Sequence, residues 1–181
     1  MTRDDDIRFP LVDWLKDIHR GEPETAYLEE LKMFRPSARA DLAVVNGEFI
    51  GYEIKSDLDR LERLEHQIPA YTSIFEKVNL VTTKKHLSSA RAIIPKWWGI
   101  IIYESNEFQI KRQAKKNREL IFSSLLFSLT VLELQAICNK ASFSYNKSWQ
   151  KRKLVKSIED DVKYDLAMPL IRDEIRNRHP L

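Results

Sequence analysis

The sequence has little cysteine, no long apolar run and no internal repeat. Its only cysteine, Cys138, excludes an internal disulfide and any cysteine-based zinc or iron–sulfur site. The four histidines are scattered without the spacing of metal ligands. No apolar stretch approaches the length of a membrane span, and the first residues, M-T-R-D-D-D, are too acidic and polar for a secretory signal. We therefore expect a cytoplasmic protein with no membrane segment.

Charge is divided unevenly along the 181 residues, a length that suits one compact domain or a modest domain with an appendage. Residues 1–110 contain 15 Lys and Arg against 19 Asp and Glu, whereas residues 111–181 contain 15 against 8. A basic C-terminal part suits a polyanionic partner such as nucleic acid. It equally suits a solvated helical surface, so charge alone leaves both interpretations open.

The order of the predicted elements indicates an α/β protein. Apolar residues at helical spacing predict two helices within residues 7–34, the second opened by Pro23, and further helices over residues 58–75, 86–93, 120–127, 131–139, 151–163 and 169–178. Runs rich in β-formers predict strands over residues 42–45, 49–55, 78–82, 98–103 and 108–111, the first two joined by a hairpin turn at Asn46-Gly47. We expect a mixed sheet flanked by helices in residues 1–112, followed by a basic helical appendage in residues 113–181.

The hairpin carries the residues with the most specific chemistry. Asp41 lies near the start of its first strand, and Glu53 and Lys55 share one face of its second strand because side chains alternate along a strand. Two carboxylates and the backbone carbonyl of Ile54 suffice as protein ligands for Mg²⁺ or Mn²⁺. A lysine beside them can orient a water or offset charge on a phosphate. Glu-x-Lys alone is common on solvated strands, so the prediction rests on the combination with Asp41 and the turn.

This combination resembles the PD-(D/E)XK nuclease superfamily. Asp41 matches the superfamily's Asp, and Glu53-Ile54-Lys55 matches its (D/E)-x-K, whereas Ala40 replaces the usual Pro. The resemblance implies a restriction-endonuclease-like fold and a third acidic residue on an early helix. We expect this residue to be Glu30, as a catalytic and metal-binding side chain, with Glu29 as the alternative.

A second element resembles the RecB-like branch of the same superfamily. Gln67 and Tyr71 match its Gln-x-x-x-Tyr element and share one helical face, although Pro69 between them departs from the pattern. The resemblance implies that both side chains orient Lys55, a water or a DNA strand. A surface amide and a core aromatic residue are the alternative for this pair.

The resemblance implies a Mg²⁺- or Mn²⁺-dependent phosphodiesterase, a deoxyribonuclease that acts as an endonuclease and forms a homodimer. One alternative keeps the nuclease fold without catalysis, as a module that binds DNA or another partner. The other alternative is an RNase toxin in conflicts between phage and host.

Basic residues in the C-terminal part are the candidate contacts for nucleic acid. The segment from Leu129 to Asp160, two short helices around a polar, basic loop, loosely resembles a SAP-like or helix-turn-helix DNA-binding appendage, and a helical hairpin packed on the core is the alternative. The candidates are Lys111, Arg112, Lys115, Lys116, Arg118, Lys147, Lys151, Arg152 and Lys153.

Overall fold

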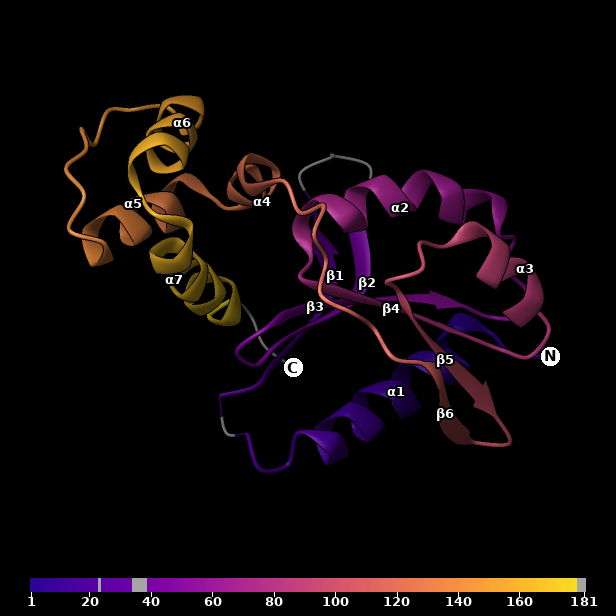
Figure 1. The fold of residues 1–181 in the computed structure, drawn as a ribbon. Helices are drawn as coiled ribbons and strands as arrows, with labels where there is room; N and C mark the ends of the chain where they lie inside the picture. The colour runs from indigo at the N-terminus through magenta and orange to yellow at the C-terminus, as the bar shows by residue number, and fades with distance from the viewer. Residues whose placement is uncertain (23, 34–38, 179–181) are drawn as a thin grey trace.

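The computed structural model describes residues 1–22, 24–33 and 39–178, which form an α/β structure around one mixed sheet (Figure 1). In these residues the sheet has six strands in sequence order: β1 (Ala26–Lys32), β2 (Arg39–Val45), β3 (Phe49–Lys55), β4 (Lys77–Thr82), β5 (Gly99–Glu104) and β6 (Glu107–Arg112). The first three strands form an antiparallel meander, β3, β4 and β5 run parallel, and β6 returns antiparallel. The predicted mixed sheet flanked by helices is confirmed.

Helices cover both faces of this sheet. On one face lies α1 (Asp4–Ile18); on the other lie α2 (Glu62–Ile74) and α3 (Leu87–Ile93), which make the crossovers between the parallel strands (Figure 1). The remaining helices gather beside α2 and the hairpin turn: α4 (Phe122–Ser128), α5 (Val131–Lys140), α6 (Lys151–Asp161) and α7 (Tyr164–Arg176). The last of them begins at Tyr164 and contains Pro169, which the sequence predicts as a helix start.

The hairpin forms as the sequence predicts. Gly47 has φ +94°, a left-handed conformation that costs glycine nothing, and the Asn46 amide donates to the Glu48 carbonyl at 3.2 Å. Leu42 then pairs with Tyr52 and Val45 with Phe49. The turn therefore fixes which residues of β2 and β3 lie opposite each other.

The predicted second helix of residues 7–34 is wrong: its described part is the strand β1. Glu29 pairs with Leu42 and Leu31 with Ala40, so Glu30 lies opposite Asp41 without a shift in register, and its φ of +49° is left-handed. On either side of this irregular residue, Leu28 and Leu31 both face the same hydrophobic core. Their spacing of three residues imitates a helical period. Pro23 and Phe34 lie outside the described residues.

Two hydrophobic layers sandwich the sheet. Ile7, Leu11 and Leu15 of α1 pack on one face, with Tyr52 and Ile54 among the sheet residues that they cover. The layer on the α2 side continues through α4 to α7, so residues before and after position 112 share one hydrophobic cluster. The division into two domains at this position stays a prediction.

No single described helix is long and apolar enough to cross a membrane. Taken together, α4 and α5 reach the required length and composition, but they meet at a bend of 117°.

Candidate cation site at the ends of β2 and β3

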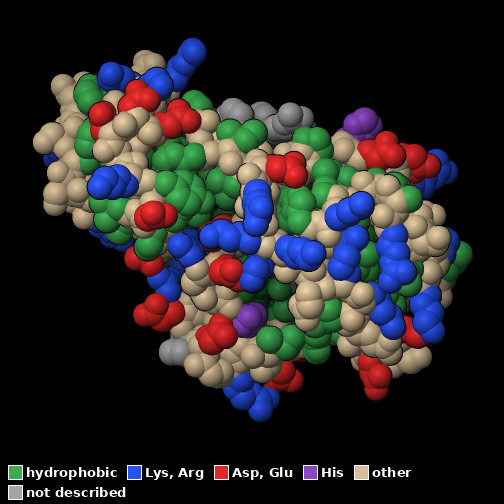
Figure 2. All heavy atoms as spheres, viewed as in Figure 1, with side chains coloured by type: hydrophobic (Ala, Val, Ile, Leu, Met, Phe, Trp, Pro, Cys, Tyr) green, Lys and Arg blue, Asp and Glu red, His purple; other side chains and the backbone are tan. Residues whose placement is uncertain are grey.

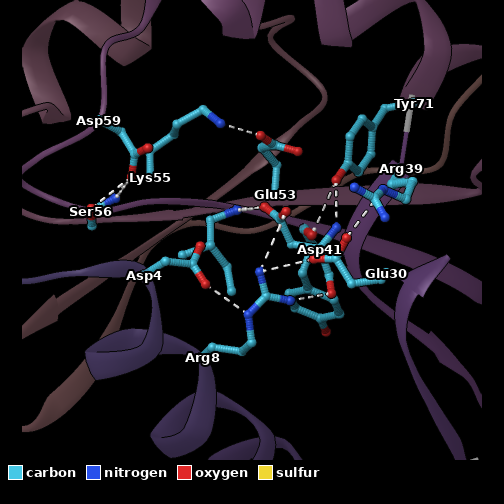
Figure 3. A network of polar contacts seen from close by, with 12 residues as sticks. Asp4, Arg8, Glu30, Arg39, Asp41, Glu53, Lys55, Ser56, Asp59 and Tyr71 are labelled. Carbon is cyan, nitrogen blue, oxygen red and sulfur yellow. Dashed lines mark hydrogen bonds and ion pairs between the residues drawn. The ribbon is translucent and has the colours of Figure 1, made fainter. Parts of the chain in front are cut away.

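Asp41, Glu53 and Lys55 come together at the adjacent ends of β2 and β3 (Figure 3). The register of the hairpin places Asp41 and Glu53 one residue beyond the pair Leu42–Tyr52. Glu53 is 0% exposed and Lys55 is 7% exposed, so both polar side chains lie in the interior, on the α2 side of the sheet. The predicted shared face of Glu53 and Lys55 is confirmed, and Ile54 packs in the opposite core layer.

The two carboxylates have different partners. Glu53 accepts a hydrogen bond from Lys55 Nζ through Oε1, while its buried Oε2 has no partner among the described residues. Asp41 accepts from the Ile54 amide through Oδ2 at 2.7 Å. One carboxylate oxygen of Glu53 is therefore withdrawn from water without compensation, which costs free energy.

Tyr71 of α2 reaches this site, as Figure 3 shows. Its hydroxyl accepts from the Asp41 amide at 3.2 Å and donates to the Tyr52 carbonyl at 3.3 Å. The tyrosine thus ties α2 to the backbone of both strands. Gln67 lies one turn earlier on α2, half-buried, and its Oε1 is also buried without a partner in the described part of the chain.

Glu30 lies on β1, opposite Asp41, and not on the early helix that the sequence predicts. Its side chain is 49% exposed and forms ion pairs with Arg8 at 3.4 Å and with Arg39 at 3.3 Å. Arg8 projects from α1 and also approaches Asp41, whose backbone oxygen accepts from Nη1 at 2.7 Å. Sequence reasoning misses Arg8, because its only local signal is Asp4 four residues earlier, with which it pairs.

Asp41 has a perturbed acidity. The pKa of its carboxyl is raised to about 7, first by burial and second by the negative charge of Glu53. The Ile54 amide, Lys55 and Arg8 oppose this shift. Burial and Glu53 together outweigh these three groups and disfavour a negative charge on Asp41.

This donor set fits a hard divalent cation in part. Within the described ranges, no three His, Cys, Asp or Glu side chains are grouped as metal ligands. Asp41 and Glu53 offer two carboxylates, which suits Mg²⁺ because this ion keeps several waters when bound to proteins. The free, buried Oε2 of Glu53 is the atom that such a cation would satisfy.

Basic side chains gather in a band across one face of the molecule (Figure 2). The segment from Phe108 to Arg118 contains five Lys and Arg and no acidic residue. One of its members, Arg112, is engaged in the structure, donating to the Trp98 carbonyl at 2.6 Å and to the Pro95 carbonyl at 3.1 Å.

A second basic group surrounds the start of α6. Residues 141–158 contain Lys147, Lys151, Arg152, Lys153 and Lys156 and no acidic residue. The Lys153 ammonium lies 5.1 Å from the centre of the Trp149 ring. Both groups therefore combine positive charge with exposed surface, and the second adds an aromatic ring.

Comparison with known proteins gives the family of the chain. The family model described as bacteriophage P4 protein cII matches residues 1–180. The chain belongs to the bacteriophage P4 protein cII family.

Two individual proteins are similar to this chain over part of its length. Protein cII of Enterobacteria phage P4 is 31% identical over 112 residues, which are 61% of this chain and 42% of the phage protein. The match thus spans less than half of that relative. A protein of unknown function from Silicibacter pomeroyi, SPO1766, has a solved structure that aligns with a TM-score of 0.42 and 16% identity, over 55% of this chain and 66% of that one.

Membership in the P4 cII family corrects the resemblance to the PD-(D/E)XK superfamily and its RecB-like branch. The family model spans 180 residues, whereas the nuclease motif rests on a handful of polar positions that recur on many strands and helices. Neither the family nor its phage relative is described as a nuclease. The predicted deoxyribonuclease is therefore wrong, as are its alternatives, a silent nuclease-fold binding module and an RNase toxin.

Proposed function

We propose that the P4 cII family chain binds Mg²⁺ or Mn²⁺ through Asp41 and Glu53. The observation that carries this proposal is the fully buried Glu53, whose Oε2 has no partner in the described residues. Burying a carboxylate oxygen without a donor is costly, and a cation at this atom would remove the cost. The raised pKa of Asp41 supports the same proposal, because burial and the neighbouring Glu53 carboxylate both disfavour its negative charge, which a cation would neutralise. The Ile54 carbonyl stays a predicted ligand.

We infer from the same groups a Mg²⁺- or Mn²⁺-dependent phosphodiesterase reaction. When bound, such a cation supplies a more acidic water and stabilises charge on a phosphate. The Lys55 ammonium donates a hydrogen bond to Glu53 at the same site, where it can offset negative charge on a phosphate oxygen. Tyr71 fixes the amide of Asp41 and keeps its carboxylate in place. The restriction-endonuclease-like form of the fold stays a prediction, supported by the mixed sheet with these groups at its strand ends.

Cation binding is tested directly by calorimetric titration of Mn²⁺ into the metal-free protein. We expect the wild type to bind Mn²⁺. Glu53→Gln should lose at least about ten-fold in affinity, because a neutral amide is a poor ligand for a hard cation. Glu159→Gln should bind as the wild type does. Glu159 is an exposed residue of α6 and serves as the matched control. Absence of binding by the wild type, or equal binding by Glu53→Gln, would sink the proposal.

The reaction is tested with bis(4-nitrophenyl) phosphate, a small diester that needs no macromolecular contact. We expect release of nitrophenol with Mn²⁺, none with a chelator, and none for Asp41→Asn or Lys55→Ala. Hydrolysis that survives both substitutions would place any activity elsewhere.

A second proposal concerns nucleic acid as a partner, and the two acid-free basic segments favour it. Lys and Arg contacts to phosphates supply affinity that does not depend on sequence. This affinity comes from the release of counterions, so it falls as the salt concentration rises. The expected contacts are Lys111, Lys115, Lys116, Arg118, Lys147, Lys151, Arg152 and Lys153.

Fluorescence anisotropy with labelled DNA and RNA tests this partner in the presence of a chelator, so that the cation site has no part in the result. The triple substitution of Lys115, Lys116 and Arg118 by Ala should weaken binding. It should also reduce the steepness of log affinity against log salt concentration by about three, one for each lost phosphate contact. Lys84→Ala removes a lysine that is paired with Glu104 and should change neither. Binding that is independent of salt would exclude this surface. The cytoplasmic location and the homodimer stay predictions.

A further inference from the structure

Glu30 lies opposite Asp41 on the neighbouring strand, between the pairs Glu29–Leu42 and Leu31–Ala40. It adopts φ +49°, which costs a residue other than glycine free energy. Glu30 is thus a third carboxylate near Asp41 and Glu53.

Arg8 engages this third carboxylate. The guanidinium is 12% exposed and faces three acidic side chains, at 2.7 Å from Asp4, 3.4 Å from Glu30 and 3.6 Å from Asp41 Oδ1 (Figure 3). A guanidinium presents several donors in a rigid, planar fork, so it can hold these partners together with the Asp41 carbonyl. It cannot bind a metal ion, because it has no acceptor.

We propose that Arg8 withholds Glu30 from the cation site and so limits the site to two carboxylates. The inference rests on the proposed cation binding by Asp41 and Glu53. The ion pairs with Arg8 and Arg39 hold the partly exposed Glu30 carboxylate away from Asp41 and Glu53. They explain why no three acidic side chains in the described residues are grouped as ligands. When Arg8 is absent, Glu30 is free to act as a further ligand, and the site also loses a nearby positive charge. Arg8 therefore determines how strongly the protein holds its cation.

Titration of Mn²⁺ into Arg8→Gln tests this inference through a gain of affinity, which a merely disrupted structure would not produce. We expect Arg8→Gln to bind Mn²⁺ about ten-fold more tightly than the wild type, since a unit charge a few ångströms away has an effect of this order. Glu30→Gln alone should change the affinity by less than about two-fold, and the double variant should lose most of the gain. Arg20→Gln, an exposed arginine beyond the end of α1 that pairs with Asp17, is the matched control and should bind as the wild type does.

Two further results decide the inference. Equal or weaker binding by a folded Arg8→Gln protein overturns it, and so does a gain that persists in full in the double variant, because Glu30 would then contribute nothing. Should Arg8→Gln fail to fold, Arg8→Lys keeps the charge but cannot hold all four partners; a smaller gain supports the inference and wild-type affinity overturns it. Failure of the wild type to bind Mn²⁺ contradicts the proposed cation site itself, a result distinct from any of these.

Discussion

At the scale of single residues, the buried pair of Glu53 and Lys55 sets the character of the site. Both side chains lie under α2, yet their mutual hydrogen bond leaves Glu53 Oε2 without a partner in the described structure. Breaking such a pair leaves an uncompensated buried charge, while keeping it incurs the desolvation of both groups. The arrangement is therefore poor as a source of stability and well suited to attracting a cation.

Asp41 makes the stability of the metal-free protein depend on pH. Its folded pKa of about 7 lies above the ordinary value of 3.8, so the folded state keeps a proton that the unfolded state releases. The carboxyl's contribution to stability is therefore fully present below its unfolded pKa and is lost as pH rises through about 7. We expect Asp41→Asn to raise the free energy of unfolding by about 1–3 kcal/mol near pH 8 and to change it little near pH 4.

Urea unfolding at both pH values, with a chelator present, measures this difference. Asp165→Asn on α7 is a control and should show no comparable rise near pH 8. A stabilisation by Asp41→Asn that is equal at both pH values would contradict the raised pKa.

The hydroxyl of Tyr71 should matter to both stability and cation binding. In Tyr71→Phe the Asp41 amide and the Tyr52 carbonyl lose a buried partner. We expect a loss of about 1–3 kcal/mol in urea unfolding and a weaker affinity for Mn²⁺, because Asp41 is less firmly held. Tyr164→Phe removes a hydroxyl from a residue that is 41% exposed and should cost much less. Unchanged stability of Tyr71→Phe would show that these two long hydrogen bonds contribute nothing.

The sequence predicts some of these residues well and others not at all. Asp41, Glu53 and Lys55 follow from local rules, because the turn at Asn46-Gly47 fixes the register and alternation fixes the face. Arg8 meets Asp41 across 33 positions of sequence, through the packing of α1 on the sheet. No local pattern encodes a contact of that kind.

At the scale of secondary-structure elements, β1 shows how one irregular residue misleads an analysis of periodicity. A regular strand would place Leu28 and Leu31 on opposite faces, whereas across Glu30, with φ +49°, both lie in the core layer on the α2 side. The resulting interval of three suits a helix as well as an irregular strand. The pairing with β2 decides between a helix and a strand, and the local sequence holds no information on this pairing.

The strain at Glu30 can be measured. Glycine adopts positive φ without cost, so Glu30→Gly should be better tolerated than Glu29→Gly by about 1 kcal/mol, even though it removes two partly exposed ion pairs. Glu29 precedes it in the same strand, is regularly paired with Leu42 and serves as the matched control. Thermal or urea unfolding of both variants makes the comparison, and a greater loss for Glu30→Gly would contradict the left-handed conformation of Glu30.

At the scale of the whole molecule, the C-terminal helices belong to the same hydrophobic cluster as the sheet. Ile171 of α7 is 0% exposed within that cluster, and Arg172 contacts both the Gly47 carbonyl and, at 3.7 Å, Glu76. Arg176 adds an ion pair with Glu24 at 2.6 Å. The helices after α3 thus support the hairpin that carries the candidate site.

This continuity predicts a single cooperative unfolding transition for sheet and helices. Ile171→Ala should lower the free energy of unfolding by about 2–4 kcal/mol while keeping one transition, observed both by circular dichroism and by tryptophan fluorescence. Leu166→Ala on the same helix removes a side chain that is 50% exposed and should cost far less. Two separate transitions would instead support independent domains on either side of position 112.

The left-handed conformation of Glu30 also bears on association between copies of the chain. In the described sheet β1 is an edge strand, and exposed edges of this kind tend to pair with strands of other molecules. Glu30 in the middle of β1 departs from the extended backbone that such pairing needs, and the charged Glu29 and Lys32 lie nearby. Growth of the sheet across this edge is thereby disfavoured, and we expect any symmetric assembly of the chain to form through another surface.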